Sequence, residues 1–230
     1  MTSTLPLADT RDMIGLHEVF RQALTSPYAA AVPGGDTARV ELVGSYLDNV
    51  LKLLHAHHEG EDELMTPRLL ERCTPAEALL VSQIADMHGP VMADIAAAET
   101  VISVWRTSGT IVDRDAVVAA LAGLNASLIP HLDQEEQVVL PIAGRYLYAS
   151  EWGELPSHGM RTFTGDKLWL ILGLVQEQMP APAIEQMEAH MPPPVLHAWQ
   201  SSGRNEYAAF ITTLRNIEMP GPRSPLGTSS

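Results

Sequence analysis

Two segments of the 230-residue chain repeat the same spacing of histidine, glutamate and proline. The first contains His57-x3-Glu61 and the second contains His131-x3-Glu135, and in both a proline follows six residues after the glutamate. Residues four apart lie on the same face of an α-helix, one turn from each other. Each His–Glu pair can therefore face one side of a helical bundle. The alternative, two solvated acidic helix faces with a chance spacing, is disfavoured by the duplication.

Each repeat is preceded by a segment that has one more histidine among apolar residues. His17 lies 40 residues before His57, and His88 lies 43 residues before His131. The chain therefore contains two tandem helical hairpins, and each contributes two imidazoles and one carboxylate. Burying these groups without partners would cost several kcal/mol apiece. A pair of metal dications would remove that cost, and imidazoles with bridging carboxylates suit iron, with manganese or zinc as alternatives.

The elements that must position these residues are helices. Strand signals are nearly absent, whereas apolar residues recur at the i, i+3, i+4, i+7 spacing. The sequence TPAE is typical of a helix start, because Thr74 can cap the helix, Pro75 suits its first position and Glu77 completes a capping box. We expect an all-α fold built on an up-down-up-down four-helix bundle. The predicted helices span about 10–25, 37–65, 74–106 and 113–142.

The chain is expected to divide into three parts. Residues 1–145 would form the bundle, residues 146–218 a C-terminal helical extension that packs on it, and residues 219–230 a disordered tail. Within the extension, 144–159 is interpreted as a connector, and proline-rich turns separate the later helices. These helices are predicted over about 166–179, 181–190 and 193–217.

Two prolines flank the candidate ligands. Pro90 follows His88 by two residues, and Pro130 directly precedes His131. A proline inside a helix removes one backbone hydrogen bond and usually kinks the helix. We expect such kinks to turn both histidines inward; the alternative is that the prolines mark helix breaks.

The other histidines and nearby acids are assigned supporting roles. His55 and His58 lie about 200° and 100° from His57 around the helix, so we expect them at the surface or beside the ligands. The acids next to the repeats are expected to be solvated or to orient the ligand imidazoles; these are Glu59, Asp62, Glu63, Asp133 and Glu136. Tyr46 belongs to the core stripe, where it either packs or lines an iron pocket. Three further histidines are interpreted as structural: His158, His190 and His197.

Composition bounds the classes of partner. The net charge of −14 would repel a phosphate backbone, which excludes nucleic acid as an expected partner. Cys73 is the only cysteine, so no intrachain disulfide can form, as is usual in a reducing cytosol. The first residues do not have the pattern of a signal peptide, and the apolar run at 168–175 is too short to span a bilayer. We expect a cytoplasmic protein with no membrane partner.

In these histidines and glutamates the chain resembles the hemerythrin-like family, whose HHE domain binds cations, over about residues 10–145. The resemblance implies a non-haem di-iron centre with an oxo or hydroxo bridge inside a four-helix bundle. The ligand set that it implies is His17 and His57 on one iron, His88 and His131 on the other, and Glu61 and Glu135 bridging both.

One position departs from the oxygen-carrying members of the family. They have a fifth histidine one turn after the histidine of the third helix, and here that position is Met92. A thioether is a poor ligand for a hard ferric ion. Two imidazoles per metal would then leave both irons with an open position, which favours activation of O2, hydrogen peroxide or NO over inert oxygen carriage.

The sequence leaves two classes of function open, with a lean toward the first. The first is an enzyme: an oxidase or oxygenase that acts on a small organic substrate and draws on an electron donor, or a catalase-like peroxide scavenger. The second is a sensor or store for O2, NO or iron, without turnover, in which the extension contacts a partner or forms a homodimer. A metal-stabilised bundle without redox function is the third, plainer alternative.

Overall fold

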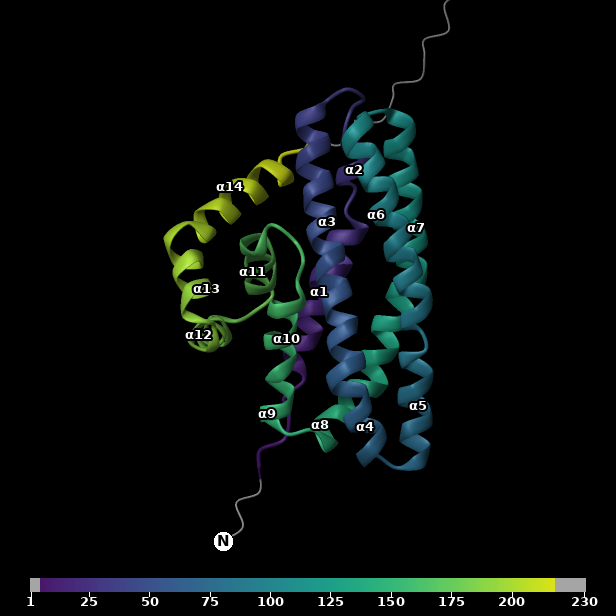
Figure 1. Ribbon diagram of the computed structural model, residues 1–230, viewed down its shortest axis with the longest axis vertical. Helices are drawn as coiled ribbons and strands as arrows, with labels where there is room; N and C mark the ends of the chain where they lie inside the picture. The colour runs from purple at the N-terminus through teal and green to yellow at the C-terminus, as the bar shows by residue number, and fades with distance from the viewer. Residues whose placement is uncertain (1–4, 218–230) are drawn as a thin grey trace, which may run out of the picture.

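The computed structural model describes residues 5–217 and shows an elongated all-α bundle (Figure 1). Four long antiparallel helical runs form it, as expected. The first is α1 (Arg11–Thr25), and a short helix, α2 (Tyr28–Ala31), follows it. The others are α3 (Thr37–Gly60) with η1 (Glu61–Met65) and α4 (Thr66–Arg72); α5 (Pro75–Ala85) with α6 (His88–Ser108); and α7 (Ile111–Gln134) with η2 (Glu135–Val139) and α8 (Leu140–Tyr146). The predicted tail, 219–230, lies outside the described residues.

Local sequence signals explain where the helices begin and end. The Asp36 side chain accepts a hydrogen bond from the backbone N–H of Arg39 at the start of α3, and Thr74 forms the predicted capping box with Glu77 at the start of α5. Gly109 ends α6 with a φ of 63°, a left-handed conformation that glycine adopts at little cost.

The predicted helix boundaries are wrong in four places. The second and fourth runs continue to Arg72 and Tyr146, because the wide turns η1 and η2 directly precede Pro67 and Pro141 and let each run continue past a residue that cannot donate an N–H. The third run is not one helix, since α5 ends at Ala85 and α6 starts at His88. The predicted connector at 144–159 instead contains two short helices, α9 (Ala149–Trp152) and most of α10 (Glu154–Thr162).

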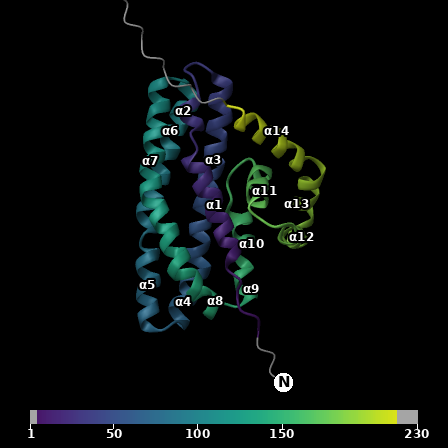
Figure 2. The ribbon, with the colours of Figure 1, turned by 180° about the vertical axis from the view of Figure 1, so that it is seen from behind.

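The later helices cover one flank of the bundle. They are α11 (Leu168–Glu177), α12 (Ala181–His190), α13 (Pro193–Ala198), η3 (Trp199–Gly203) and α14 (Arg204–Arg215). Helix α10 packs along α3, α11 packs on α1 and α3, and α14 packs on α11 (Figures 1 and 2). On the opposite flank, α6 and α7 pack against each other. The three predicted helical stretches after residue 166 are therefore confirmed.

The interior is divided into two apolar clusters. The larger one includes Phe20, Leu54 and Leu128, and the smaller one includes Met65 and Val139 together with residues of α5 and α8. Along each long helix, the candidate ligands fall between a residue of the first cluster and a residue of the second. The buried polar residues thus form a layer between two apolar halves.

Among the described residues, one continuous run, Ile111–Tyr146, is long and apolar enough to cross a membrane by these two criteria alone. It belongs to the bundle, where it packs against α1 and α6 and carries His131 and Glu135 in its buried face. A core helix of a bundle has the same length and composition.

Candidate metal centre

The six residues predicted to bind metal are all buried and lie together. Their exposed fractions range from 0% for His17, Glu61 and His131 to 7% for His57. Their ligand atoms belong to two groups, and within each group the atoms lie within 4.8 Å of one another. The groups are His17, His57, Glu61 and Glu135, and His58, Glu61, His88 and His131.

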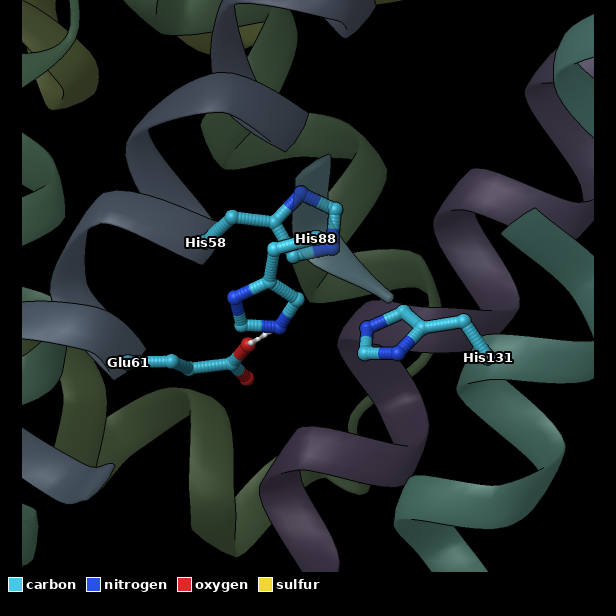
Figure 3. Close-up of side chains that lie close together, drawn as sticks. All are labelled: His58, Glu61, His88 and His131. Atoms are coloured by element: carbon cyan, nitrogen blue, oxygen red, sulfur yellow. Dashed lines mark ion pairs between the residues drawn. The ribbon is translucent and has the colours of Figure 1, made fainter. Parts of the chain in front are cut away.

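His58 is the member that the sequence interpretation missed. It was expected at the surface or beside the ligands, but it is 1% exposed, and its ring lies 4.5 Å from that of His88 and 5.1 Å from that of His131 (Figure 3). The usable signal was its spacing to Glu61, because residues three apart are also neighbours on a helix face. The two groups therefore contain two and three imidazoles, one imidazole more than the predicted set of ligands.

Glu61 and Glu135 lie between the two groups. Glu61 is 3.3 Å from Nε2 of His57 in one group and 3.4 Å from Nε2 of His88 in the other. Glu135 is 3.4 Å from Nε2 of His17 and 3.8 Å from Nε2 of His131. Each carboxylate thus contacts one imidazole on either side, which is the placement that a bridging ligand requires.

A wide helical turn begins at each of these glutamates. The π-helical segments η1 and η2 start at Glu61 and Glu135, and the backbone N–H groups of Thr66 and Leu140 bond five residues back to the two glutamate carbonyls. Pro67 and Pro141 follow directly. Because proline has no N–H and its ring crowds the carbonyl four residues back, the wider turn relieves a conflict that an α-turn would have. The duplicated proline of the sequence thus marks these two turns.

Two acids hold the outward nitrogens of two imidazoles. Nδ1 of His17 lies 2.9 Å from Glu136, and Nδ1 of His88 lies 2.7 Å from Asp62. Each acid directly follows one of the central glutamates, so the predicted orienting role is confirmed for both. Arg21 donates to Glu136 at 2.7 Å and fixes it in turn. With Nδ1 held in this way, Nε2 of each ring faces the interior of the site.

Burial sets the protonation states of the cluster. It raises the pKa of the Glu61 carboxyl to about 8 and the pKa of Glu135 well above its ordinary value, to which the facing Glu61 charge adds. It also lowers the pKa of His131 to about 3 and the pKa values of His57 and His58 well below the ordinary range, and neighbouring imidazoles add to these shifts. Neutral imidazoles are the form that binds a metal, whereas the carboxyls must lose their protons to it.

The buried polar atoms of this layer fit a bound metal. Within residues 5–217, no hydrogen-bond partner is present for Nε2 of His17 or His57, for either ring nitrogen of His58 or His131, or for the carboxylate oxygens of Glu61 and Glu135. Buried polar atoms are nearly always paired in folded proteins. Neutral imidazoles and carboxylates that converge without partners are the donor set of a transition-metal site.

The remaining candidates lie elsewhere. Met92 is half-buried and packs on the larger apolar cluster, and Tyr46 lies 11 residues from His57, roughly 16 Å along α3. Tyr46 therefore packs away from the ligands rather than lining their pocket. His55 is exposed, as expected, and so are His190 and His197 in the extension. His158 is buried, and its ring contacts the position of Gly60 on α3, in agreement with a structural role.

The two prolines beside His88 and His131, Pro90 and Pro130, occupy different positions in their helices. Pro130 lies inside α7, directly before His131, as a kinking residue would. Pro90 does not interrupt a helix, because α6 starts at His88 and Pro90 lies in its first turn. For Pro90 the alternative of a helix break was closer to the structure.

A small depression at the surface reaches the ligands. Its volume is about 10 Å³, and Glu61, Glu135, His88 and His131 form its floor. Its walls come from α5 and the two wide turns, and Thr66 and Ala85 are half-buried at its side. A space of this size holds one water molecule. The site thus has an opening for very small molecules.

Comparison with protein families agrees with this geometry. No curated protein and no solved structure matches the chain. The family model of the hemerythrin HHE cation-binding domain matches residues 9–143, which is more than half of the chain and includes every residue of both ligand groups. The chain therefore belongs to the hemerythrin HHE cation-binding family, whose domain binds a metal through such a His/Glu cluster.

Proposed function

We propose that the centre holds two iron ions and reacts with hydrogen peroxide. His17 and His57 would bind one iron, His58, His88 and His131 the other, and Glu61 and Glu135 both. The observation that carries the proposal is the pair of ligand groups that share Glu61 between unequal sets of imidazoles. Mixed nitrogen and oxygen donors with shared carboxylates suit iron better than magnesium or calcium, while manganese and zinc remain alternatives.

Because the two groups hold different numbers of imidazoles, we expect the two irons to have different numbers of protein ligands. The side with three imidazoles has one more protein donor than the side of His17 and His57. The iron bound by His17 and His57 would therefore keep an open coordination position that the iron bound by His58, His88 and His131 lacks. The depression at the ligands lies beside His88 and His131, so a small molecule would enter next to the three-imidazole iron and pass the shared glutamates to reach that position. A single open position replaces the expectation of an open position on both irons.

The size of the opening favours hydrogen peroxide over an organic substrate. The depression at the ligands measures about 10 Å³, whereas pockets for organic substrates usually measure several hundred. A bound iron pair supplies the electron exchange that peroxide chemistry requires. In disproportionation, one peroxide is oxidised to O2 and a second is reduced to water, so no external electron donor is consumed. The apolar walls of α5 exclude bulk water, and the acids at His17 and His88 hold the ligand rings in place.

Reversible binding of O2 or NO, as in a sensor or store, is the second candidate. It is favoured by the fifth buried imidazole, His58, because the oxygen-carrying hemerythrins also have five histidines. The first candidate converts hydrogen peroxide over many cycles, whereas the second binds O2 or NO without converting it. A cytosolic location, a homodimer and the absence of a nucleic-acid partner remain predictions from composition.

The test is anaerobic purification with metal analysis, followed by exposure to air and to hydrogen peroxide. We expect about two irons per chain and evolution of O2 from peroxide over many turnovers. A stable spectrum that forms in air and reverses on removal of O2, without peroxide turnover, would support the second candidate. Glu61→Ala, which removes the shared ligand, should lose both metal and activity, whereas His55→Ala, on the exposed face of the same helix, should change neither.

A further inference from the structure

A second cavity lies between the bundle and the later helices, away from the metal centre. Its volume is about 120 Å³. Helices α1, α2 and α3 provide one side and α11 and α14 the other. Gln22 and Arg215 are exposed at its margin, so it opens to the surface, whereas Tyr46 is 4% exposed. The cavity is therefore a surface pocket with a buried phenol in its wall.

The phenol of Tyr46 is a polar group without a protein partner. Its ring lies 5.9 Å from that of Tyr28 at 84°, and both rings line the cavity without a side-chain hydrogen bond to the described residues. Burial raises the pKa of the Tyr46 phenol above its ordinary value, so the hydroxyl keeps its proton and can donate. The Tyr46 hydroxyl is not among the buried unpaired atoms of the described residues, so it is open to the cavity and can donate to a molecule that enters.

The charges around the cavity favour a neutral ligand. Among the described residues that line it, Arg215 alone is charged, and its guanidinium is paired with Glu177, at 3.1 Å for Nη1 and 2.5 Å for Nη2. The Arg215 guanidinium would repel a cation. The Glu177 carboxylate and the net charge of −14 would repel an anion. The pocket therefore attracts neither cations nor anions.

The remaining walls combine apolar surface with amides. Val19, Leu174 and Ile211 provide aliphatic contact. Nε2 of Gln178 donates to Gln22 at 3.3 Å, which leaves the Gln178 carbonyl as an acceptor. A ligand with an apolar body and one hydroxyl can use both the apolar wall and the donor and acceptor groups.

We propose that this pocket binds a small uncharged molecule with an apolar ring or chain and a single hydroxyl group, of the size of phenol. An apolar cavity of about 150 Å³ holds benzene, so a partly open one of similar size accommodates a ring whose edge faces solvent. Aromatic edge contacts with the tyrosine pair would add to the burial. The pocket is independent of the iron chemistry, because Tyr46 lies roughly 16 Å from His57 along α3.

The test is calorimetric titration of the metal-loaded full-length chain with phenol. We expect saturable binding of one phenol per chain. Tyr46→Phe, which removes only the hydroxyl, should weaken binding about fivefold, the effect of one hydrogen bond. Tyr148→Phe, an exposed tyrosine beside α9, is the matched control and should bind as the unaltered chain does. Benzoate, the anionic analogue, should bind at least tenfold more weakly than phenol.

Filling the cavity provides a second readout. Leu174→Phe and Ile211→Phe add volume from opposite helices, and either variant that keeps its metal content and melting temperature should lose phenol binding. Absence of saturable binding to the unaltered chain would overturn the proposal. So would equal affinity in the unaltered chain, Tyr46→Phe and the folded cavity-filling variants.

Discussion

Nδ1 of His17 on α1 lies 2.9 Å from the carboxylate of Glu136, the residue that follows the central Glu135. The second hairpin thereby orients an imidazole of the first. The reverse also holds, since Asp62 of the first hairpin contacts His88 of the second at 2.7 Å. The two hairpins hold each other's ligands, so the site is complete only when both are packed together.

We expect Glu136→Gln to weaken metal binding by about 10–100-fold, because the amide no longer holds the His17 ring as an anion does. Nothing in the change removes a proposed metal ligand. Competition with a coloured chelator measures the affinity. Glu71→Gln, on the exposed face of α4, is the matched control. Equal affinity of both variants and the unaltered chain would mean that Glu136 does not position the ring.

The unequal ligand groups predict unequal losses. His58→Ala removes a donor from one group only, so about one iron per chain should remain. Glu61→Ala removes a residue shared by both groups, so both irons should be lost. Metal analysis after gel filtration distinguishes these results. If His58→Ala kept two tightly bound irons, His58 would be a packing residue and not a ligand.

The metal-free protein should be most stable near pH 6.5. The unfolded chain releases the Glu61 proton at about pH 4.5, whereas the folded chain keeps it until about pH 8, so this group lowers stability as the pH rises between those two values. Below 6.5, the histidines are protonated in the unfolded chain, while burial keeps His131 neutral to about pH 3, so stability falls as the pH falls.

Thermal melts of the metal-free chain at pH 5, 6.5 and 8 measure this dependence. Glu61→Gln, which cannot ionise, should weaken the decline between pH 6.5 and 8 and steepen the loss of stability between pH 6.5 and 5, where the Glu61 carboxyl opposes the histidines. Bound metal should remove the alkaline decline as well, since it holds the carboxylates in their charged form. A melting temperature of the metal-free chain that rises steadily to pH 8 would contradict the expectation.

The depression at the ligands should control access. Ala85→Phe places a ring at its side, so peroxide turnover should fall at least tenfold while iron content stays the same. The rate at which azide changes the spectrum of the loaded protein should fall in parallel, which reports access without catalysis. Ala96→Phe, on the exposed face of α6, is the matched control. Unchanged azide kinetics in Ala85→Phe would show that small molecules reach the site by another route.

Repeated motifs made most of this fold predictable from the sequence. The capping box of Thr74 and Glu77 depends only on residues within one helical turn, so the sequence predicts it directly. The spacing of four residues between His57 and Glu61 places both on one helix face. His58 was missed because it lies about 100° from His57 around the helix, and only the face that holds His57 and Glu61 was assigned to the metals. Two metals side by side present a wider target, which a residue about 100° away can also reach.

Long-range packing accounts for what the sequence did not reveal. The break before His88 has no glycine or proline in the last turn of α5 or at residues 86 and 87 to mark it, and Pro90 pointed to the wrong residue. The pocket at Tyr46 is built from five helices that are far apart in the chain. No local pattern encodes such an assembly.

The wide turns η1 and η2 keep the residues that follow them on the buried side of their helices. The buried positions after each histidine are spaced by four: His57, Glu61, Met65 and Leu69 in one run, and His131, Glu135, Val139 and Ala143 in the other. In a regular α-helix every such step advances about 40° around the axis, so three steps would carry the last side chain toward solvent. Each of the π-helical turns η1 and η2 contains one residue more than an α-turn. This additional residue returns the following side chains to the buried side of the helix. Deleting one residue at 62–64 or 136–138 should therefore swing the downstream stripe outward by about 100° and expose Leu69 or Ala143, even though every ligand is still encoded.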